Sequence, residues 1–408
     1  MISQCKLSKE ASSVLLKDSL LHFFKEESST GKLLLVAVFM AMYLANSPYA
    51  WLYQYLTDLR VTVSVDSFVI DKPLLHWIND GLMGFFFFMV GLEIKREAVE
   101  GSLKEKGRIM LPIFAALGGM LVPALIYIAF NWENGRALEG WGVPVATDIA
   151  FALGILSLFG KRVPPGLKIF LLALAIFDDI GAIMIIALYY SHDLVPTAFG
   201  IATVMVALLI LINRFWIVNN SVYIFLGLLL WLALLKSGVH ATLGGVIIGL
   251  SIPIKNNEQS FANLQGSLHA PVSFIILPLF AFVNSGIVFD TLDISDLTDN
   301  VTMGIALGLL LGKQAGIFIF SWIAVKAGFS HLPHGVNWPQ IYGVAVLSGV
   351  GFTMSLFIGS LAFQCSDGAC YDITDDRLGI LIGSFLSGIF GYLLLKSQLK
   401  DKVEPSPN

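Results

Sequence analysis

The chain has 408 residues, of which 56% are hydrophobic and only 13% are charged. Soluble domains usually contain about 25% charged residues, so this composition excludes an ordinary cytosolic enzyme and a disordered chain. The net charge of −4 provides no basic surface for a nucleic acid or another polyanion. We therefore expect a membrane protein, in which each span needs roughly 20 apolar residues.

Apolar segments bounded by charged residues, Pro and Gly predict an all-α polytopic membrane protein with about 12 transmembrane helices. These segments form one predicted transmembrane domain (31–396) between an N-terminal segment (1–30) and a C-terminal tail (397–408). Most of the 25 Lys and Arg residues fall on the side that holds both termini, so the positive-inside rule makes that side cytoplasmic. The segments are 33–48, 74–94, 109–130, 143–159, 167–190, 197–213, 217–235, 238–253, 270–289, 301–325, 339–363 and 378–396.

Two loops on the opposite, external side stand out. The sequence VTVSVDSFVI (61–70) alternates apolar and polar residues, which predicts a short external β-hairpin. The hairpin either pairs with a second copy of the chain by edge addition or lies as an extended loop on the membrane surface. Cys365 and Cys370 share a polar loop, where they either form a disulfide in an oxidising compartment or remain thiols.

Ionisable residues inside predicted spans indicate function, because a charge in hydrocarbon costs several kcal/mol unless it faces a cavity or a partner. Asp148 follows Thr147 in GWGVPVATDIAFALGIL, where Pro144 removes a backbone donor and predicts a broken helix within 143–159. Glycines and hydroxyls in YGVAVLSGVGFTMSLFIGSLAF predict a second interruption within 339–363. Two interrupted helices in corresponding halves are typical of an inverted-repeat transporter, although close packing of small residues needs the same composition.

Asp178 and Asp179 are adjacent in LLALAIFDDIGAIMIIAL. Neighbouring side chains on a helix point about 100° apart, so one carboxylate is expected to face a cavity while the other reaches a neighbouring helix. Two close carboxylates in a low dielectric resist double ionisation and titrate as a coupled unit. The pair can therefore hold one hard cation or protons, which is the minimum needed to exchange the two. The alternative is a buried acid pair satisfied by hydroxyls and backbone groups.

Lys313 lies in GIALGLLLGKQAGIFIF, near the middle of a predicted span. Its expected partner is the Asp pair or Asp148, unless it offsets the dipoles of the broken helices or stabilises the fold. Two histidines, His240 in SGVHATLGGV and His269 in LHAPVSFIILPLFAF, lie at the ends of spans and titrate between pH 5 and 8 if they are unperturbed. An interfacial histidine is more often a neutral residue with its hydrogen bonds satisfied.

Six motifs in order resemble the NhaA family of bacterial sodium–proton antiporters, from about residue 31 to residue 395: FMVGLEIKRE, VATDIAFALG, FDDIGAI, SGVHATL, LLLGK and SGVGFTMSLFIG. The resemblance implies inverted-topology repeats with two crossed discontinuous helices, and a homodimer joined through the external hairpin. It implies a multi-pass protein of the bacterial inner membrane. The implied function is pH-regulated, electrogenic exchange of cytoplasmic Na⁺ or Li⁺ for external protons, in sodium and pH homeostasis, with no enzymatic activity and no cofactor.

The resemblance also implies residue roles. Asp178 and Asp179 would bind the transported cation and the protons. Charge compensation at the helix crossing would fall to Thr147, Asp148 and Lys313. The best-known family member has Glu-His where this chain has Gln265 and Gly266, so the pH profile is expected to differ. The candidates for the pH response are Glu93, Arg96, Glu97, His240 and His269.

Three other functions stay open on the sequence. A sodium-coupled symporter for an organic anion would need more mid-span cations than Lys313. A cation channel would have little use for buried carboxylates that can be neutralised. A scaffold without transport activity would leave the energetic cost of the mid-span aspartates unexplained.

Overall fold

The computed structural model describes residues 27–65, 68–101, 106–191, 194–215, 218–255, 257–363 and 373–399. The loop with Cys365 and Cys370 lies outside the described residues, as do most of the predicted terminal segments 1–30 and 397–408.

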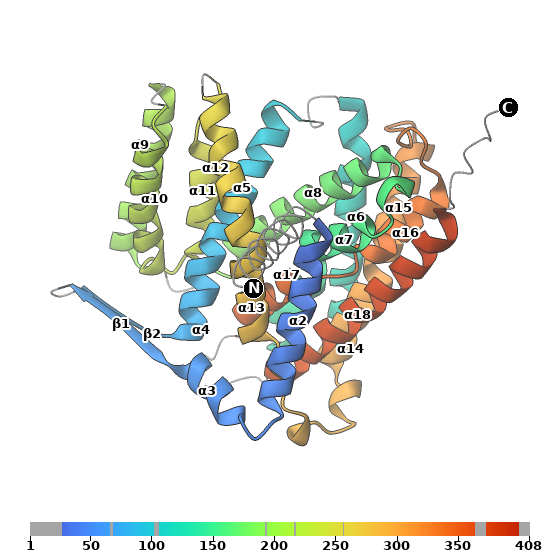
Figure 1. Cartoon of the computed structure of the whole chain (residues 1–408), viewed down its shortest axis with the longest axis horizontal. Coiled ribbons are helices and arrows are strands. Elements are labelled where there is room, and N and C mark those ends of the chain that lie inside the picture. The colour runs from blue at the N-terminus through green and yellow to red at the C-terminus, as the bar shows by residue number, and fades with distance from the viewer. Residues whose placement is uncertain are drawn as a thin grey trace, which may run out of the picture.

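Helices make up nearly all of the described chain, as the apolar composition predicts (Figure 1). Three π-helical turns, η1 (Trp77–Leu82), η5 (Val272–Ile276) and η8 (Gly308–Gly312), each connect two α-helical pieces. The 3₁₀ segments are η3 (Ala137–Val145), η4 (Gly160–Arg162), η6 (Phe289–Thr291) and η7 (Asp296–Thr298). The α-helices are α2 (Glu27–Ala45), α3 (Ala50–Asp58), α4 (Leu74–His76), α5 (Met83–Val99), α6 (Lys106–Asn131), α7 (Ile149–Ser157), α8 (Pro165–Tyr189), α9 (Pro196–Arg214), α10 (Asn220–Leu235), α11 (Thr242–Ser251), α12 (Glu258–Pro271), α13 (Leu277–Asn284), α14 (Asn300–Leu307), α15 (Lys313–Lys326), α16 (Trp338–Leu347), α17 (Phe352–Ala362) and α18 (Ile373–Gln398).

Fewer helices are long and apolar enough to span a membrane than the sequence predicts. Within the described residues, 8 helices are long and apolar enough to cross a membrane, or up to 10 if each of two bent helix pairs counts as one span. The bent pairs are α2 with α3, at 111°, and α16 with α17, at 45°. Two further apolar helices, α10 and α11, are shorter than a full span. Each predicted segment therefore contains a helix, but the predicted total is not reached on this criterion.

The predicted hairpin is present and projects from the bundle as a two-stranded arm (Figure 1). Strands β1 (Arg60–Val65) and β2 (Phe68–Pro73) pair antiparallel, with Val63 opposite Ile70. Ile70 is buried, whereas Val63, its direct partner in the other strand, is exposed. The hairpin is therefore a regular element of the fold rather than an extended surface loop.

Both strands are attached to the helices by long-range hydrogen bonds. Trp77 in η1 donates its indole N–H to the carbonyl oxygen of Val61 in β1, at 3.0 Å. Lys236, which follows α10, donates from Nζ to the carbonyl oxygen of Val69 in β2, at 2.9 Å. The arm is thus fastened to two separate elements of the bundle, near its base through Val61 and near its turn through Val69.

Close helix contacts through glycine position the middle of the bundle. A Cβ atom on Gly118 in α6 would lie 2.2 Å from the carbonyl oxygen of Gly316 in α15, and a Cβ on Gly316 would lie 2.0 Å from that of Gly118. Only glycine allows this approach, which is the small-residue packing expected between membrane helices. It places α6 directly against α15, the helix that begins with Lys313.

Candidate functional site

Two interrupted helices meet at their breaks. The first consists of η3, which ends at Val145, and α7, which begins at Ile149; it starts at Ala137, before the predicted boundary at 143. Pro144 lies in this first part, which is 3₁₀ rather than α-helical. The second consists of α16 and α17, with the break at 348–351. Both predicted interruptions are therefore present.

Asp148 connects the two breaks. Its backbone N–H donates to the carbonyl oxygen of Val350 at 2.7 Å. Its Oδ1 accepts the backbone N–H of Phe151 at 2.9 Å and so caps the start of α7. Its Oδ2 accepts the backbone N–H and the hydroxyl of Thr353, at 3.1 and 2.5 Å. One buried carboxylate thus satisfies donors at the first turns of both α7 and α17.

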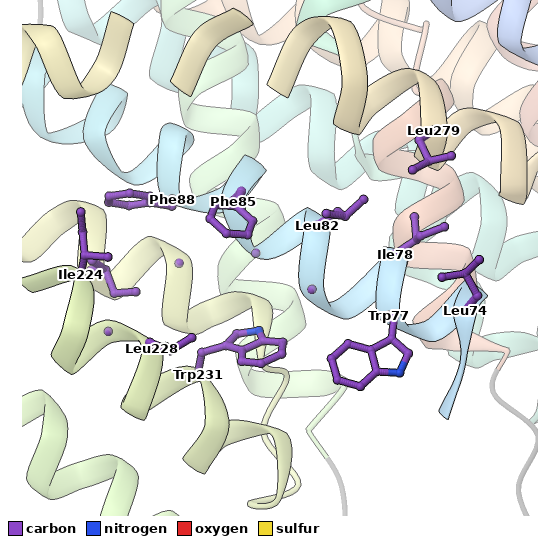
Figure 2. A pocket seen from close by; sticks show the side chains of 15 residues that line it. Leu74, Trp77, Ile78, Leu82, Phe85, Phe88, Ile224, Leu228, Trp231 and Leu279 are labelled. Atoms are coloured by element: carbon purple, nitrogen blue, oxygen red, sulfur yellow. The ribbon is translucent and has the colours of Figure 1, made fainter. Parts of the chain in front are cut away.

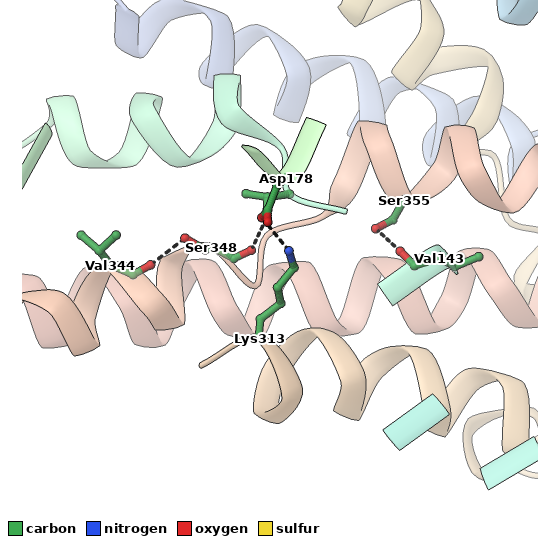
Figure 3. Close-up of polar contacts among 7 residues, drawn as sticks. Val143, Asp178, Lys313, Val344, Ser348 and Ser355 are labelled. Carbon is green, nitrogen blue, oxygen red and sulfur yellow. Dashed lines mark hydrogen bonds and ion pairs between the residues drawn. The ribbon is translucent and has the colours of Figure 1, made fainter. Parts of the chain in front are cut away.

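Asp178 forms a buried ion pair with Lys313, which resolves the choice of partner that the sequence leaves open (Figure 3). Lys313 Nζ lies 2.8 Å from Asp178 Oδ2, and both side chains are 0% exposed. Thr147 Oγ1 also lies 2.7 Å from this oxygen and 3.0 Å from the carbonyl oxygen of Ser348. Since a hydroxyl has one proton, Thr147 donates to only one of these acceptors at a time. Asp178 Oδ1 is buried, and no described residue hydrogen-bonds to it.

Asp179 has different surroundings from Asp178, as the 100° spacing on a helix predicts. It lines a cavity of about 280 Å³ that Thr147, Asp148 and Glu93 also line. No hydrogen bond to its carboxylate is formed by any residue in the described part of the chain. One acid of the pair is therefore held by a cation, while the other faces open space.

Of the five residues predicted to take part in a pH response, only some lie at the cavity that contains Asp179. Glu93 and His269 line the same cavity as Asp179. Arg96 donates to Oε1 of Gln265 at 3.0 Å, and Gln265 is itself part of the cavity wall. Glu97 lies one turn beyond Glu93 on α5 and is not part of the wall. His240 lies elsewhere, just before α11 and close in sequence to Lys236, which bonds to Val69 near the turn of the hairpin.

Besides Gln265, four polar residues of the cavity wall are missing from the predicted site. Thr353 belongs to it through its bonds to Asp148, and its position just after the second break was a usable signal. Thr30, Lys168 and Ser273 line the cavity from α2, α8 and η5. The sequence gives no signal for these three, because only the packing of distant helices brings them to Asp179.

Comparisons with known proteins point to one family. A family model described as Na⁺/H⁺ antiporter 1 matches residues 21–395. The Na(+)/H(+) antiporter NhaA of Pseudomonas fluorescens (strain Pf0-1) is 50% identical over 380 residues, which cover 92% of this chain and 96% of that protein. The Na(+)/H(+) antiporter NhaA 2 of Shewanella denitrificans is 52% identical over 383 residues, which cover 93% of this chain and 96% of that protein.

A solved structure has a similar fold. The sodium proton antiporter MjNhaP1 from Methanocaldococcus jannaschii matches with a TM-score of 0.52, covering 91% of this chain and 93% of that chain. The two sequences are 15% identical, so the likeness concerns the fold alone.

Proposed function

Since the chain belongs to the Na⁺/H⁺ antiporter 1 family, we propose that it exchanges Na⁺ or Li⁺ for protons at the carboxylates of Asp178 and Asp179. The family is one of transporters and not of enzymes, and the protein is a multi-pass membrane protein. One observation supports this assignment of the site: Asp178 is paired with Lys313, whereas the neighbouring Asp179 faces the cavity.

Cation binding starts from the cavity. Asp179 presents its carboxylate there without a hydrogen-bond donor, so its oxygens are available to a hard cation. Asp178 Oδ1, which accepts no hydrogen bond from the described residues, supplies a further oxygen. The hydroxyl oxygen of Thr147 is a third candidate ligand, because it is within 2.7 Å of Asp178. The transported ion would thus replace the missing hydrogen bonds of this pair.

Protons compete with the cation for the same oxygens. The deprotonated pair binds Na⁺, and the positive charge of Na⁺ next to Asp178 weakens the hold of that carboxylate on Lys313. A proton arriving at Asp179 and a proton taken up by Lys313 release the cation, and the ion pair between Lys313 and the ionised Asp178 forms again. We propose that more protons than cations move in each cycle. Each net charge that crosses then gains about 2.3 kcal/mol per 100 mV of membrane potential.

The rest of the proposal concerns the assembly of the transporter. Counting α10, α11 and the two bent pairs as spans gives the full set of about 12 helices, arranged as inverted repeats around the two breaks. One transmembrane domain (31–396) carries them, and both termini lie in the cytoplasm of a bacterium whose inner membrane holds the protein. The hairpin joins two copies into a homodimer by strand addition. Glu93, Arg96, Glu97, His240 and His269 tune the pH response.

Flux in everted membrane vesicles tests this function. Vesicles with an imposed pH gradient receive NaCl between about pH 6.5 and 8.5, the range around histidine titration. We expect Na⁺ to release protons from vesicles with the wild-type chain, and no such release with Asp179→Asn. Asp290→Asn, which changes an exposed loop acid, is the matched control and keeps the flux. No Na⁺-dependent flux from folded wild-type protein would rule out exchange. Flux that survives in Asp179→Asn would move the site to other residues.

A further inference from the structure

A second, larger cavity lies on a different face of α5 from the candidate ion site (Figure 2). This apolar pocket has a volume of about 690 Å³ and lies between η1 with α5 on one side and α10 with α11 on the other. Figure 2 shows Phe85, Ile224 and Leu228 in the space between these elements. Their side chains are 52%, 45% and 55% exposed, so the pocket opens sideways from the bundle.

The walls of the apolar pocket offer no polar group to a ligand. The residues that line it, all within the described chain, are Leu, Ile, Phe, Gly and two Trp. The indole N–H of Trp77 is donated to the carbonyl oxygen of Val61, and that of Trp231 lies 3.4 Å from the carbonyl oxygen of Asp80. The side-chain donors of the wall are therefore already used, and the chemistry of the pocket selects a hydrocarbon.

The pocket is long enough to hold an acyl chain within one half of a bilayer. Its wall runs along α4, η1 and α5 from Leu74 to Phe88, which is about 20 Å at 1.5 Å per residue. These residues lie inside the candidate span Leu74–Val99, so the surrounding medium is lipid rather than water. One leaflet of the hydrocarbon core is about 15 Å thick. A single extended chain lying along these helices would fit this space.

The end of the pocket near the hairpin has the features of a membrane interface. Trp77 and Trp231 belong to the residue type that is enriched at the level of lipid headgroups. Lys236 follows Trp231 by less than two helical turns, and its side chain is exposed. Lys72 in β2 is held by Asp80 of η1 at 2.8 Å. The charge of Lys72 is therefore already balanced by Asp80, and Lys236 is the cation beside the indole end of the pocket whose charge complements a phosphate.

We propose that the apolar pocket binds one acyl chain of a membrane phospholipid, with its phosphate at the level of Lys236. The chain fills the space between η1–α5 and α10–α11, the same elements to which the hairpin is attached through Trp77 and Lys236. The bound lipid thus lies between the two elements that hold the hairpin. A second copy of this protein would bring side chains to the pocket instead, and the test below distinguishes the two occupants.

One glycine of the wall allows a sharp test. A Cβ atom on Gly81 would lie 3.8 Å from Trp231 Cζ2, an ordinary contact, so Gly81→Leu grows into the pocket without meeting backbone. Gly245 is unsuitable, because its Cβ would lie 2.2 Å from the carbonyl oxygen of Gly84. Gly200→Leu in α9 is the matched control, because nothing lies within 4 Å of its Cβ. Leu228→Trp fills the pocket from α10, and Leu125→Trp changes an equally exposed leucine in α6.

The experiment measures retained phospholipid by native mass spectrometry of the full chain, purified in detergent and titrated with dioleoylphosphatidylglycerol. We expect the wild-type protein, Gly200→Leu and Leu125→Trp to retain a phospholipid through washing. Gly81→Leu and Leu228→Trp are expected to retain it about tenfold less well, because the added side chain displaces several methylene groups.

Three results would overturn the proposal. One is a wild-type protein that retains no phospholipid after washing. Another is equal retention by the pocket-filled variants and their controls. The third is that Gly81→Leu no longer forms dimers but retains as much phospholipid as the wild-type protein. This result would show that a second copy of the chain, and not a lipid, occupies the pocket. If Gly81→Leu does not fold, Leu228→Trp decides the question alone, because its side chain is already exposed in the wild-type protein.

Discussion

The backbone N–H of Asp148 and the carbonyl oxygen of Val350 are joined by a 2.7 Å hydrogen bond between the breaks of two helices. The carboxylate of Asp148 adds bonds to Phe151 and Thr353 on either side of this contact. The breaks are thus held in register by one residue, directly beside the Lys313–Asp178 pair that Thr147 joins to the second break.

Thr353→Val tests the contribution of its hydroxyl to this junction. The substitution keeps the side-chain shape and removes the 2.5 Å bond to Asp148 Oδ2, which leaves a buried carboxylate oxygen with one donor fewer. We expect unfolding to become easier by about 1–3 kcal/mol, together with slower Na⁺-dependent flux. Thermal unfolding followed by tryptophan fluorescence measures the first effect. Thr298→Val, in an exposed turn, is the control; equal losses in both variants would contradict the prediction.

Lys313→Met tests the buried ion pair. Removal of the ammonium leaves Asp178 buried without its cation, which costs about 3–5 kcal/mol when one partner of a buried pair is lost. We expect the double variant Lys313→Met with Asp178→Asn to recover much of this loss, since neither charge then remains. A double-mutant cycle on thermal stability measures the coupling. Additive effects of the two substitutions would show that the pair contributes nothing as a pair.

Gln265→Glu tests the electrostatics of the cavity. Gln265 lines the cavity and accepts a hydrogen bond from Arg96, so the variant places a carboxylate there without a change in shape. Added negative charge favours the protonated state of the other cavity groups. The midpoint of the pH–flux profile is therefore expected at higher pH than in the wild-type protein. Gln259→Glu, exposed on the same helix, should leave the midpoint unchanged, and a shift in both variants would indicate a non-specific charge effect.

Asp71→Asn tests a pH-dependent contact in the hairpin. The Thr62 hydroxyl, followed by the Arg60 guanidinium, lowers the pKa of Asp71 below its usual range. A lowered pKa in the folded state means that the contact stabilises the hairpin above the usual pKa of aspartate and is lost as the pH falls through the lowered value. Hydrogen exchange of residues 60–73 should be faster in Asp71→Asn than in the wild-type chain near pH 6. The difference should decrease progressively as the pH falls below about 3.9, the usual pKa of aspartate; a difference that stays constant through this range would contradict this account.

The sequence predicts those parts of the structure that depend on local pattern. Alternation in 61–70 identifies the hairpin, and Pro144 with Asp148 identifies the first helix break. The helical repeat separates Asp178 from Asp179, and the structure places them accordingly. Because Asp148 and the Asp pair lie at similar predicted depths, Lys313 had two possible partners on sequence grounds. Only the tertiary packing, which brings the start of α15 to Asp178 of α8, decides between them.

Other features depend on long-range packing or on geometry that residue types do not encode. The first broken helix begins at Ala137, earlier than predicted, because the part before the break is a 3₁₀ helix that extends from Ala137 to Val145. Helices α10 and α11 are apolar but shorter than a full membrane span. The sequence counts them as spans, so the predicted number of spans exceeds the number of helices that are long enough to cross a membrane. Lys168 and Ser273 join the cavity wall only through tertiary contacts.

The order of residues along the chain has a consequence for biosynthesis. Asp148 and Asp178 leave the ribosome long before Lys313, Val350 and Thr353, which supply their ion pair and most of their long-range hydrogen bonds. For that interval both acids must enter the membrane without their final partners. The first half therefore inserts before the contacts of these two acids have formed. The junction between the two helix breaks forms only after the last third of the polypeptide has been translated.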